Sequence, residues 1–193
     1  MTRAPRRIAF LDRDGTLVWD RPGFYLRRPG QLRLYSGTIR ALRLLRGAGY
    51  ALVVVTNQSG IGRGFLDIPM LRRIHRELHR ILKRNGIRLA GIYYCPHAPG
   101  VTCRCRKPSP YLARRALREL RLPARGAVIF GDKRADIDLG RQLGVTTVHL
   151  RTGHGRDQRE KHGKALRPTH RARNLLEGVR WLLRSAHTDY GRP

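Results

Sequence analysis

The feature that most constrains this chain is a repeated pattern, in which a short strand-like apolar run is followed at once by a cluster of polar residues. It occurs four times, in runs that end at Leu11, Val55, Tyr94 and Phe130. Such continuous apolar runs are typical of strands buried on both faces. Because ligands of an open α/β sheet bind beyond the carboxyl ends of its strands, we expect an α/β fold with a doubly wound parallel sheet and the four clusters at one edge.

Apolar residues at helical spacing separate these runs. They predict helices over 39–46, 69–83 and 174–184, a helix that starts at Ser109-Pro110, and a further buried strand over 145–150. The segment 153–173 is an exception, and its residues 155–164 are polar and basic and predict a mobile surface loop.

Length and composition predict one compact domain over 1–193. The chain is 40% hydrophobic, without repeats or a low-complexity linker, and can bury a sizeable core. The first two strands lie too close in sequence to enclose a large cap domain. A fairly open active site, suited to small soluble molecules, follows from that absence.

The first polar cluster has a catalytic layout. Asp12 and Asp14 lie two positions apart at a strand end and precede Gly15, which permits a sharp turn. Side chains at i and i+2 share one face of a strand, so both carboxylates are expected to converge while Arg13 points away. One carboxylate can attack phosphorus and the other can protonate the leaving oxygen, with Mg²⁺ between them. The alternative is an ordinary solvated turn.

The motifs together resemble the haloacid dehalogenase-type phosphatases, in the branch of the bacterial heptose bisphosphate and histidinol phosphate phosphatases. The resemblance covers roughly residues 8–153. It rests on Asp12-Arg13-Asp14-Gly15-Thr16, Thr56-Asn57-Gln58-Ser59-Gly60-Ile61, Tyr93-Tyr94-Cys95-Pro96-His97, Cys103-x-Cys105-Arg106-Lys107-Pro108 and Gly131-Asp132-Lys133. It implies a Rossmann-like fold with a zinc-binding loop and an aspartyl-phosphate mechanism.

The resemblance implies a role for each site residue. Asp12 would be the nucleophile and Asp14 the general acid and base, while Thr56 and Lys107 would hold the phosphoryl oxygens. Mg²⁺ would be bound by Asp12, the backbone carbonyl of Asp14, and Asp132, with Asp136 as a weaker candidate. Asp136 and Asp138 could equally be acids that favour a helix start, and Asp138 is left out. The substrate-binding candidates are Asp20, Asn57, Gln58, Ser59, Arg106 and Lys133; for Asp20, a helix or turn cap is the alternative.

All three cysteines lie close together in the sequence. Cys95, His97, Cys103 and Cys105 supply four ligands within the loop 95–105, which is the number and chemistry of a closed structural Zn²⁺ site. A disulfide with one spare thiol is the alternative, and the odd cysteine count argues against it. Since Arg106 and Lys107 follow directly, the zinc would fix two functional groups in place.

The charge is the feature that the resemblance does not explain. Lys and Arg number 41 against 13 Asp and Glu, which gives a formal net charge of +28. A nucleic-acid partner would account for it. We favour an arginine-rich composition spread over solvated helix faces, because the basic residues are scattered and no nucleic-acid motif is present. Nonspecific binding to polyanions is still expected.

The preferred function is therefore a Mg²⁺-dependent phosphomonoesterase that removes the 7-phosphate of a heptose 1,7-bisphosphate. Histidinol phosphate is the rival substrate, and a nucleic-acid-binding protein that acts on polynucleotide ends is the alternative from another class. Neither a signal peptide nor a membrane span is recognisable in the sequence. We accordingly expect a monomeric cytoplasmic enzyme with no membrane partner.

Overall fold

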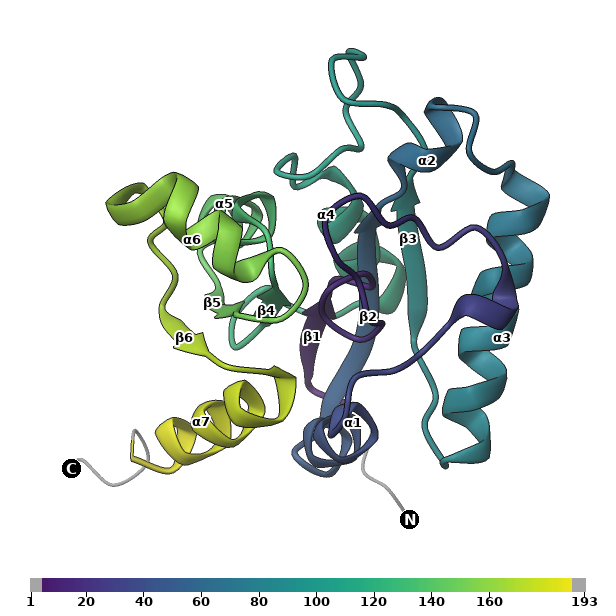
Figure 1. Cartoon of the computed structure of the whole chain (residues 1–193). Coiled ribbons are helices and arrows are strands. Elements are labelled where there is room, and N and C mark those ends of the chain that lie inside the picture. The colour runs from purple at the N-terminus through teal and green to yellow at the C-terminus, as the bar shows by residue number, and fades with distance from the viewer. Residues whose placement is uncertain (1–4, 189–193) are drawn as a thin grey trace.

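The computed structural model describes residues 5–188, and its centre is a six-stranded sheet in which every pairing is parallel (Figure 1). The strand order is β3-β2-β1-β4-β5-β6. The strands are β1 (Arg7–Leu11), β2 (Tyr50–Asn57), β3 (Gly91–Cys95), β4 (Val128–Gly131), β5 (Thr146–Leu150) and β6 (His170–Ala172). The order reverses at β1, so the carboxyl ends of β1, β2 and β4 border the crevice where such sheets bind ligands.

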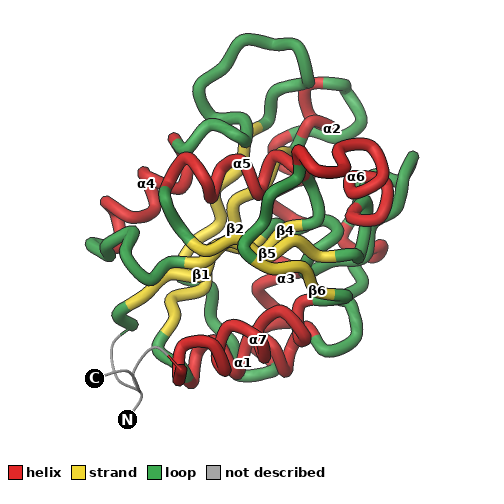
Figure 2. Tube along the Cα trace, turned by 90° about the vertical axis from the view of Figure 1, so that its left-hand side faces the viewer, coloured by secondary structure: helices red, strands yellow, loops and turns green. Residues whose placement is uncertain are grey.

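Helices cover both faces of the sheet. The α-helices are α1 (Thr38–Gly47), α2 (Ser59–Gly62), α3 (Ile68–Arg84), α4 (Tyr111–Leu120), α5 (Arg134–Leu143), α6 (Gly155–His162) and α7 (Leu175–Thr188), and the 3-10 helices are η1 (Pro29–Gln31) and η2 (Gly163–Ala165). Figure 2 shows α4 and α5 on one side of the strands and α1 and α7 on the other. This three-layer arrangement confirms the expected doubly wound fold.

Two hydrophobic cores follow from strand alternation. Ala9 and Leu11 of β1 face the core beneath α1, α3 and α7, whereas Ile8 and Phe10 face the core beneath α4 and α5. All four side chains are buried. Successive side chains of a strand point to opposite faces of the sheet. Only a strand with apolar residues at both its odd and its even positions can therefore lie at the centre of this sheet.

The prediction of a mobile surface loop over 155–164 is wrong. These residues form α6 and most of η2, and β6 follows and pairs with β5 at the sheet edge. Hydrophobic periodicity did not predict α6 because this helix is polar. The helix packs against the end of β5 through its first residue, Gly155, where any Cβ would collide with the Leu150 carbonyl oxygen. An edge strand of three residues needs only a few backbone hydrogen bonds and little apolar burial.

The strand β3 also differs from expectation, because it is not buried on both faces. It forms the opposite edge of the sheet and only Cys95 in it is buried. Tyr93 donates a hydrogen bond through its hydroxyl to Glu119 of α4, at 2.6 Å, so its ring covers the sheet while its polar end reaches the surface.

The expected absence of a large cap is confirmed for the connection between β1 and β2, which holds only a long loop, η1 and α1. The chain between β3 and α4 instead projects above the carboxyl edge of the sheet, at the top of Figure 1. Within residues 5–188, no helix combines the length and the hydropathy that crossing a membrane requires.

Candidate active site

Lys107 lies at the centre of the site, between two buried carboxylates. Its Nζ is 2.9 Å from Asp12 Oδ1 and 2.5 Å from Asp136 Oδ1, and it donates to the Val55 carbonyl oxygen at 2.8 Å. Burial alone favours the neutral amine, but the charges of Asp12 and Asp136 raise the pKa of Lys107. All three ammonium hydrogens therefore have acceptors, and the cation joins the ends of β1 and β2 to the start of α5.

Asp14 lines the same recess as Asp12, as its spacing predicts, but the expectation that Arg13 points away is wrong. Arg13 curls back instead, and its Nε and Nη2 donate to Asp14 Oδ1 and Oδ2 at 2.9 and 2.7 Å. Burial tends to raise the pKa of Asp14, and the opposing charge and hydrogen bonds of Arg13 lower it overall. A bend at Arg13, shortly after the end of β1, makes this possible.

The polar residues that end β2 mostly hold other site residues. Gln58 Nε2 donates to Asp14 Oδ2 at 2.8 Å and to Thr56 Oγ1 at 2.9 Å. Since Thr56 Oγ1 accepts that bond, its own hydroxyl hydrogen remains to be donated into the recess. Asn57 brackets the backbone of Lys107, accepting from its N–H at 2.9 Å and donating to its carbonyl at 3.2 Å.

A carboxylate cluster beside Lys107 has the chemistry of a cation site. Asp12, Asp132 and Asp136 each offer an oxygen within 4.8 Å of the others, and all three are buried. Asp132 Oδ1 is buried without a hydrogen-bond partner among the described residues, while Oδ2 accepts from the His154 backbone N–H at 2.8 Å. A buried, unpaired carboxylate oxygen among hard oxygen ligands fits Mg²⁺.

The pKa of Asp132 also supports a cation site. Burial raises its pKa to about 8; Lys133 opposes this shift, and the charges of Asp12 and Asp136 add to it. Gly15 and Gly153 have positive φ values of 83° and 56°, and a Cβ on either would collide with Asp132 Oδ2. Two glycines thus let the backbone close around a carboxylate that is poorly tolerated as an anion without a cation.

A cavity of about 360 Å³ opens above these groups. The six residues predicted to bind substrate all contribute to its walls, namely Asp20, Asn57, Gln58, Ser59, Arg106 and Lys133. Asp20 Oδ2 lies 3.5 Å from Lys133 Nζ and 3.3 Å from His154 Nε2, and no helix begins beside it. The pKa of Asp20 is raised chiefly by burial.

His154, Arg13 and Arg63 are among the cavity residues that the sequence did not single out. His154 belongs to no recognisable motif and contacts the cavity only because α6 begins there. Arg13 stands between two expected catalytic acids, and strand alternation alone assigned it to the other face. A signal existed for Arg13, since an arginine amid buried strand residues requires a carboxylate partner.

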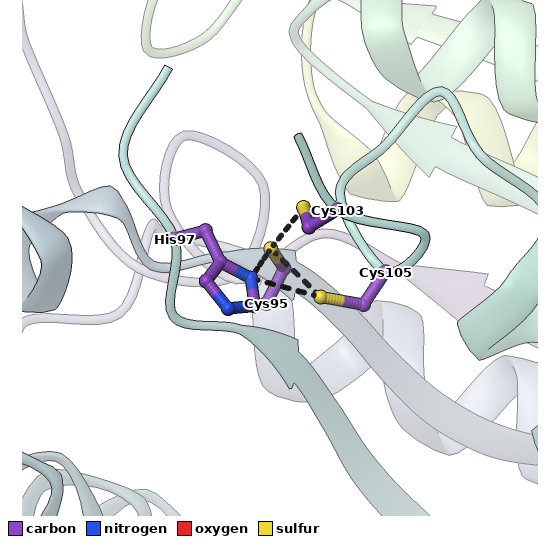
Figure 3. A group of neighbouring side chains, drawn as sticks. All are labelled: Cys95, His97, Cys103 and Cys105. Atoms are coloured by element: carbon purple, nitrogen blue, oxygen red, sulfur yellow. Dashed lines mark hydrogen bonds between the residues drawn. The ribbon is translucent and has the colours of Figure 1, made fainter. Parts of the chain in front are cut away.

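The predicted zinc ligands come together at the base of the projecting loop (Figure 3). Cys95 Sγ lies 3.1 Å from Cys105 Sγ, 3.7 Å from Cys103 Sγ and 3.5 Å from His97 Nδ1. A tetrahedron with Zn–S bonds of about 2.3 Å has ligand atoms about 3.8 Å apart. Burial raises the pKa of Cys95 to about 12, so only a bound cation would hold its thiolate form.

This cluster is attached to the cavity through the next residue. Arg106 Nη1 donates to the His97 carbonyl oxygen at 3.1 Å, which ties the guanidinium to the loop that the cysteines would close. Lys107 follows at once, with its backbone held by Asn57. Order in the projecting loop is therefore transmitted to two cationic residues of the cavity.

Known proteins resemble this chain over most of its length. The probable D-glycero-D-manno-heptose-1,7-bisphosphate 7-phosphatase of Thermoplasma acidophilum is 38% identical over 72% of this chain and 86% of its own length. The D-glycero-beta-D-manno-heptose-1,7-bisphosphate 7-phosphatase of Neisseria meningitidis is 32% identical over 85% of this chain and 87% of its own. This chain belongs to the D,D-heptose 1,7-bisphosphate phosphatase family of haloacid dehalogenase-like phosphatases. It is accordingly a phosphoric monoester hydrolase.

Solved structures agree with that family. The D,D-heptose 1,7-bisphosphate phosphatase of B. bronchiseptica, complexed with magnesium and phosphate, superimposes with a TM-score of 0.83 at 31% identity, covering 93% of this chain and 99% of that one. The Burkholderia thailandensis enzyme gives 0.69 at 25% identity, covering 92% and 98%. The HAD-hydrolase-like family model matches residues 104–178 of this phosphatase.

Proposed function

We propose that this phosphatase removes the 7-phosphate of D-glycero-D-manno-heptose 1,7-bisphosphate through an aspartyl-phosphate on Asp12. This reaction is supported by one observation, the recess that Asp12, Asp14, Thr56 and Lys107 line together. Asp12 also belongs to the carboxylate cluster that could hold a cation. The choice of sugar is supported by the relatives, which are named for that substrate and match this chain over most of their length.

In the first half-reaction, a carboxylate oxygen of Asp12 attacks phosphorus and the bond from phosphorus to the ester oxygen breaks. Asp12 Oδ1 is held by Lys107 and by the Arg13 backbone N–H at 2.8 Å, whereas Oδ2 accepts no hydrogen bond from the described residues and is the oxygen free to attack. The anionic phosphate beside Asp14 favours its protonated form, and Asp14 gives that proton to the leaving alkoxide. Thr56 and Lys107 stabilise the charge that gathers on the transferring oxygens.

In the second half-reaction, Asp14 takes a proton from water and the resulting hydroxide attacks the same phosphorus. The bond to Asp12 breaks, which regenerates its carboxylate and releases inorganic phosphate. Asp14 is well suited to this step, because the charge of Arg13 favours its ionised form.

Two metals with different tasks fit the two ligand sets. Asp12 and Asp132, with the backbone carbonyl of Asp14, would hold Mg²⁺, which supplies charge neutralisation for the phosphoryl group. Asp136 lies close enough to join them and also pairs with Lys107. Cys95, His97, Cys103 and Cys105 would hold a structural Zn²⁺, since soft and borderline ligands favour zinc.

The cavity walls suit a substrate with two phosphates and several hydroxyls. Arg106, Arg63 and Lys133 supply cationic donors around it, and Asp20 supplies an acceptor for a hydroxyl. Guanidinium groups bind phosphate through paired hydrogen bonds. Histidinol phosphate carries one phosphate and a cationic amine instead, so it makes poorer use of this predominantly basic wall.

The test is activity profiling of the purified protein with Mg²⁺. Heptose 1,7-bisphosphate, histidinol phosphate and a 5′-phosphorylated oligonucleotide are compared at near-physiological salt, with Asp12→Asn as the matched inactive control. We expect the highest kcat/KM on the heptose bisphosphate, with release of the 7-phosphate, and no turnover by Asp12→Asn. Faster hydrolysis of histidinol phosphate or of the oligonucleotide would contradict the proposed substrate, and activity in Asp12→Asn would contradict the aspartyl-phosphate.

A further inference from the structure

Arg13 is a charged side chain that is only 1% exposed, at the floor of the catalytic cavity. Burying a guanidinium is unfavourable unless its donors are satisfied by charged or polar partners. Its backbone N–H holds Asp12, and its charge favours the ionised form of Asp14. The contacts of its side chain point to a further task.

The guanidinium of Arg13 binds Asp14 as a fork. Nε and Nη2 each donate to a different oxygen of that carboxylate, at 2.9 and 2.7 Å. Nη2 also donates to Gln58 Oε1 at 2.8 Å, and Gln58 returns a hydrogen bond to Asp14 at 2.8 Å. A paired, planar contact of this kind fixes the plane of the carboxylate as well as its position.

His75 of α3 contacts the remaining guanidinium nitrogen of Arg13, Nη1. Its Nε2 lies 3.3 Å from Arg13 Nη1, and its ring contacts Tyr94 edge to face at 5.7 Å. Arginine only donates, so the histidine nitrogen must accept and the ring must be neutral. Burial, followed by the charge of Arg13, lowers the pKa of His75 to about 3, in agreement with that assignment.

We propose that Arg13 is a positioning residue, which holds the carboxylate of Asp14 in the orientation needed to protonate the leaving oxygen. This inference rests on the proposed function, in which Asp14 is the general acid. Gln58 extends the same network to Thr56, so the proton donor and a phosphoryl-binding hydroxyl are fixed relative to each other. The sequence places Arg13 between the two acids, and the fold bends it onto the second.

The leaving group distinguishes positioning from mere structural support. An alkoxide leaving group is strongly basic and needs the proton, whereas p-nitrophenolate leaves readily without one. General acid catalysis contributes about 10²–10⁴-fold where it is needed. Loss of orientation at Asp14 should therefore slow an alkyl phosphate far more than an aryl phosphate, while a general loosening of the site slows both alike.

The experiment measures kcat/KM of the full chain with Mg²⁺ on heptose 1,7-bisphosphate and on p-nitrophenyl phosphate, because this quantity covers only the steps up to the departure of the leaving group. We expect Arg13→Met to lower kcat/KM on the sugar phosphate by about 10²-fold and on the aryl phosphate by less than about tenfold. Arg13→Lys keeps the buried charge but not the fork, and should show the same bias, reduced in size. Added guanidinium ion should restore part of the sugar phosphatase activity of Arg13→Met.

Asp14→Asn is the reference for the bias, and adding Arg13→Met to it should cause little further loss on the sugar phosphate. If Arg13→Met does not fold, as judged by circular dichroism, Arg13→Lys supplies the comparison. Equal losses on both substrates in the variant that folds overturn the positioning role. If Asp14→Asn itself shows no bias, the assignment of Asp14 in the proposed function fails, and the inference fails with it.

Discussion

Replacing Lys107 by Met tests how the charges of the site are balanced. Lys107 is 5% exposed and is the cation between Asp12 and Asp136, so the variant leaves two buried carboxylates facing each other. Removing one partner of a buried ion pair costs about 3–5 kcal/mol of stability. At about 2–4 °C per kcal/mol for a domain of this size, Tm in chelator should fall by roughly 6–20 °C.

The loss of stability should depend on Mg²⁺. With the ammonium gone, a divalent cation among Asp12, Asp132 and Asp136 relieves a larger repulsion than in the parent protein, so added Mg²⁺ should raise Tm more in the variant. At a Mg²⁺ concentration of about 100 Kd, the stabilisation is about 2.7 kcal/mol. Activity should stay about 10²–10³-fold low even then, because the metal does not replace a donor to the phosphoryl oxygens.

The assay is thermal unfolding followed by circular dichroism, in chelator and through a Mg²⁺ titration, together with kcat at saturating Mg²⁺. Lys164→Met is the matched control, since Lys164 is exposed, lies in η2 and does not line the cavity or the recess. We expect this variant to change neither Tm nor kcat. An equal Tm loss at every Mg²⁺ concentration, or full activity once Mg²⁺ saturates, would refute the reasoning.

Three further predictions address other parts of the molecule. Elemental analysis should find about one zinc per chain, and Cys103→Ser should lower both zinc content and rate although Mg²⁺ is still required; unchanged values would contradict the zinc loop. His75 is held neutral in the fold, so in Mg²⁺ buffer stability is lost as pH falls below 6.5. Urea unfolding should show about 2 kcal/mol of this loss between pH 6.5 and 5, absent in His75→Leu. Neutralising Arg72, Arg76 and Lys83 on the exposed face of α3 should lower the log-log salt slope of duplex DNA binding by about 2–3, without changing kcat; an unchanged slope would exclude this face.

The residues that sequence could place are those whose position depends on a strand end. Asp12 follows β1, Thr56 lies at the end of β2 and Asp132 follows β4. Parallel strands bring such positions to one edge of the sheet, whatever the conformation of the loops. The four predicted zinc ligands also lie together, because they are close in sequence and share one chemistry. In both cases local pattern alone determines proximity.

Residues placed by long-range contacts were not predictable in this way. His154 reaches the cavity because α6 docks through Gly155 against β5, a contact that depends on the missing Cβ of a glycine in a polar segment. Asn57 lines the cavity and also holds the backbone of a residue 50 positions away, a second role that the sequence did not indicate. Such roles depend on which loop lies opposite a strand end, and hydrophobic periodicity carries no information on that.

Lys107 shows why the fold needs the projecting loop. Its ammonium must meet groups from β1, β2 and α5, yet the chain that delivers it leaves the edge strand β3 and has little apolar surface of its own. Hydrogen bonds from Asn57 fix its backbone at one point, and the cysteine cluster fixes the chain two residues before it. Because the backbone is held at both Cys105 and Lys107, the Lys107 side chain is directed into the recess. Metal ligation by this cluster would thus supply at this edge the rigidity that core packing supplies to Asp12.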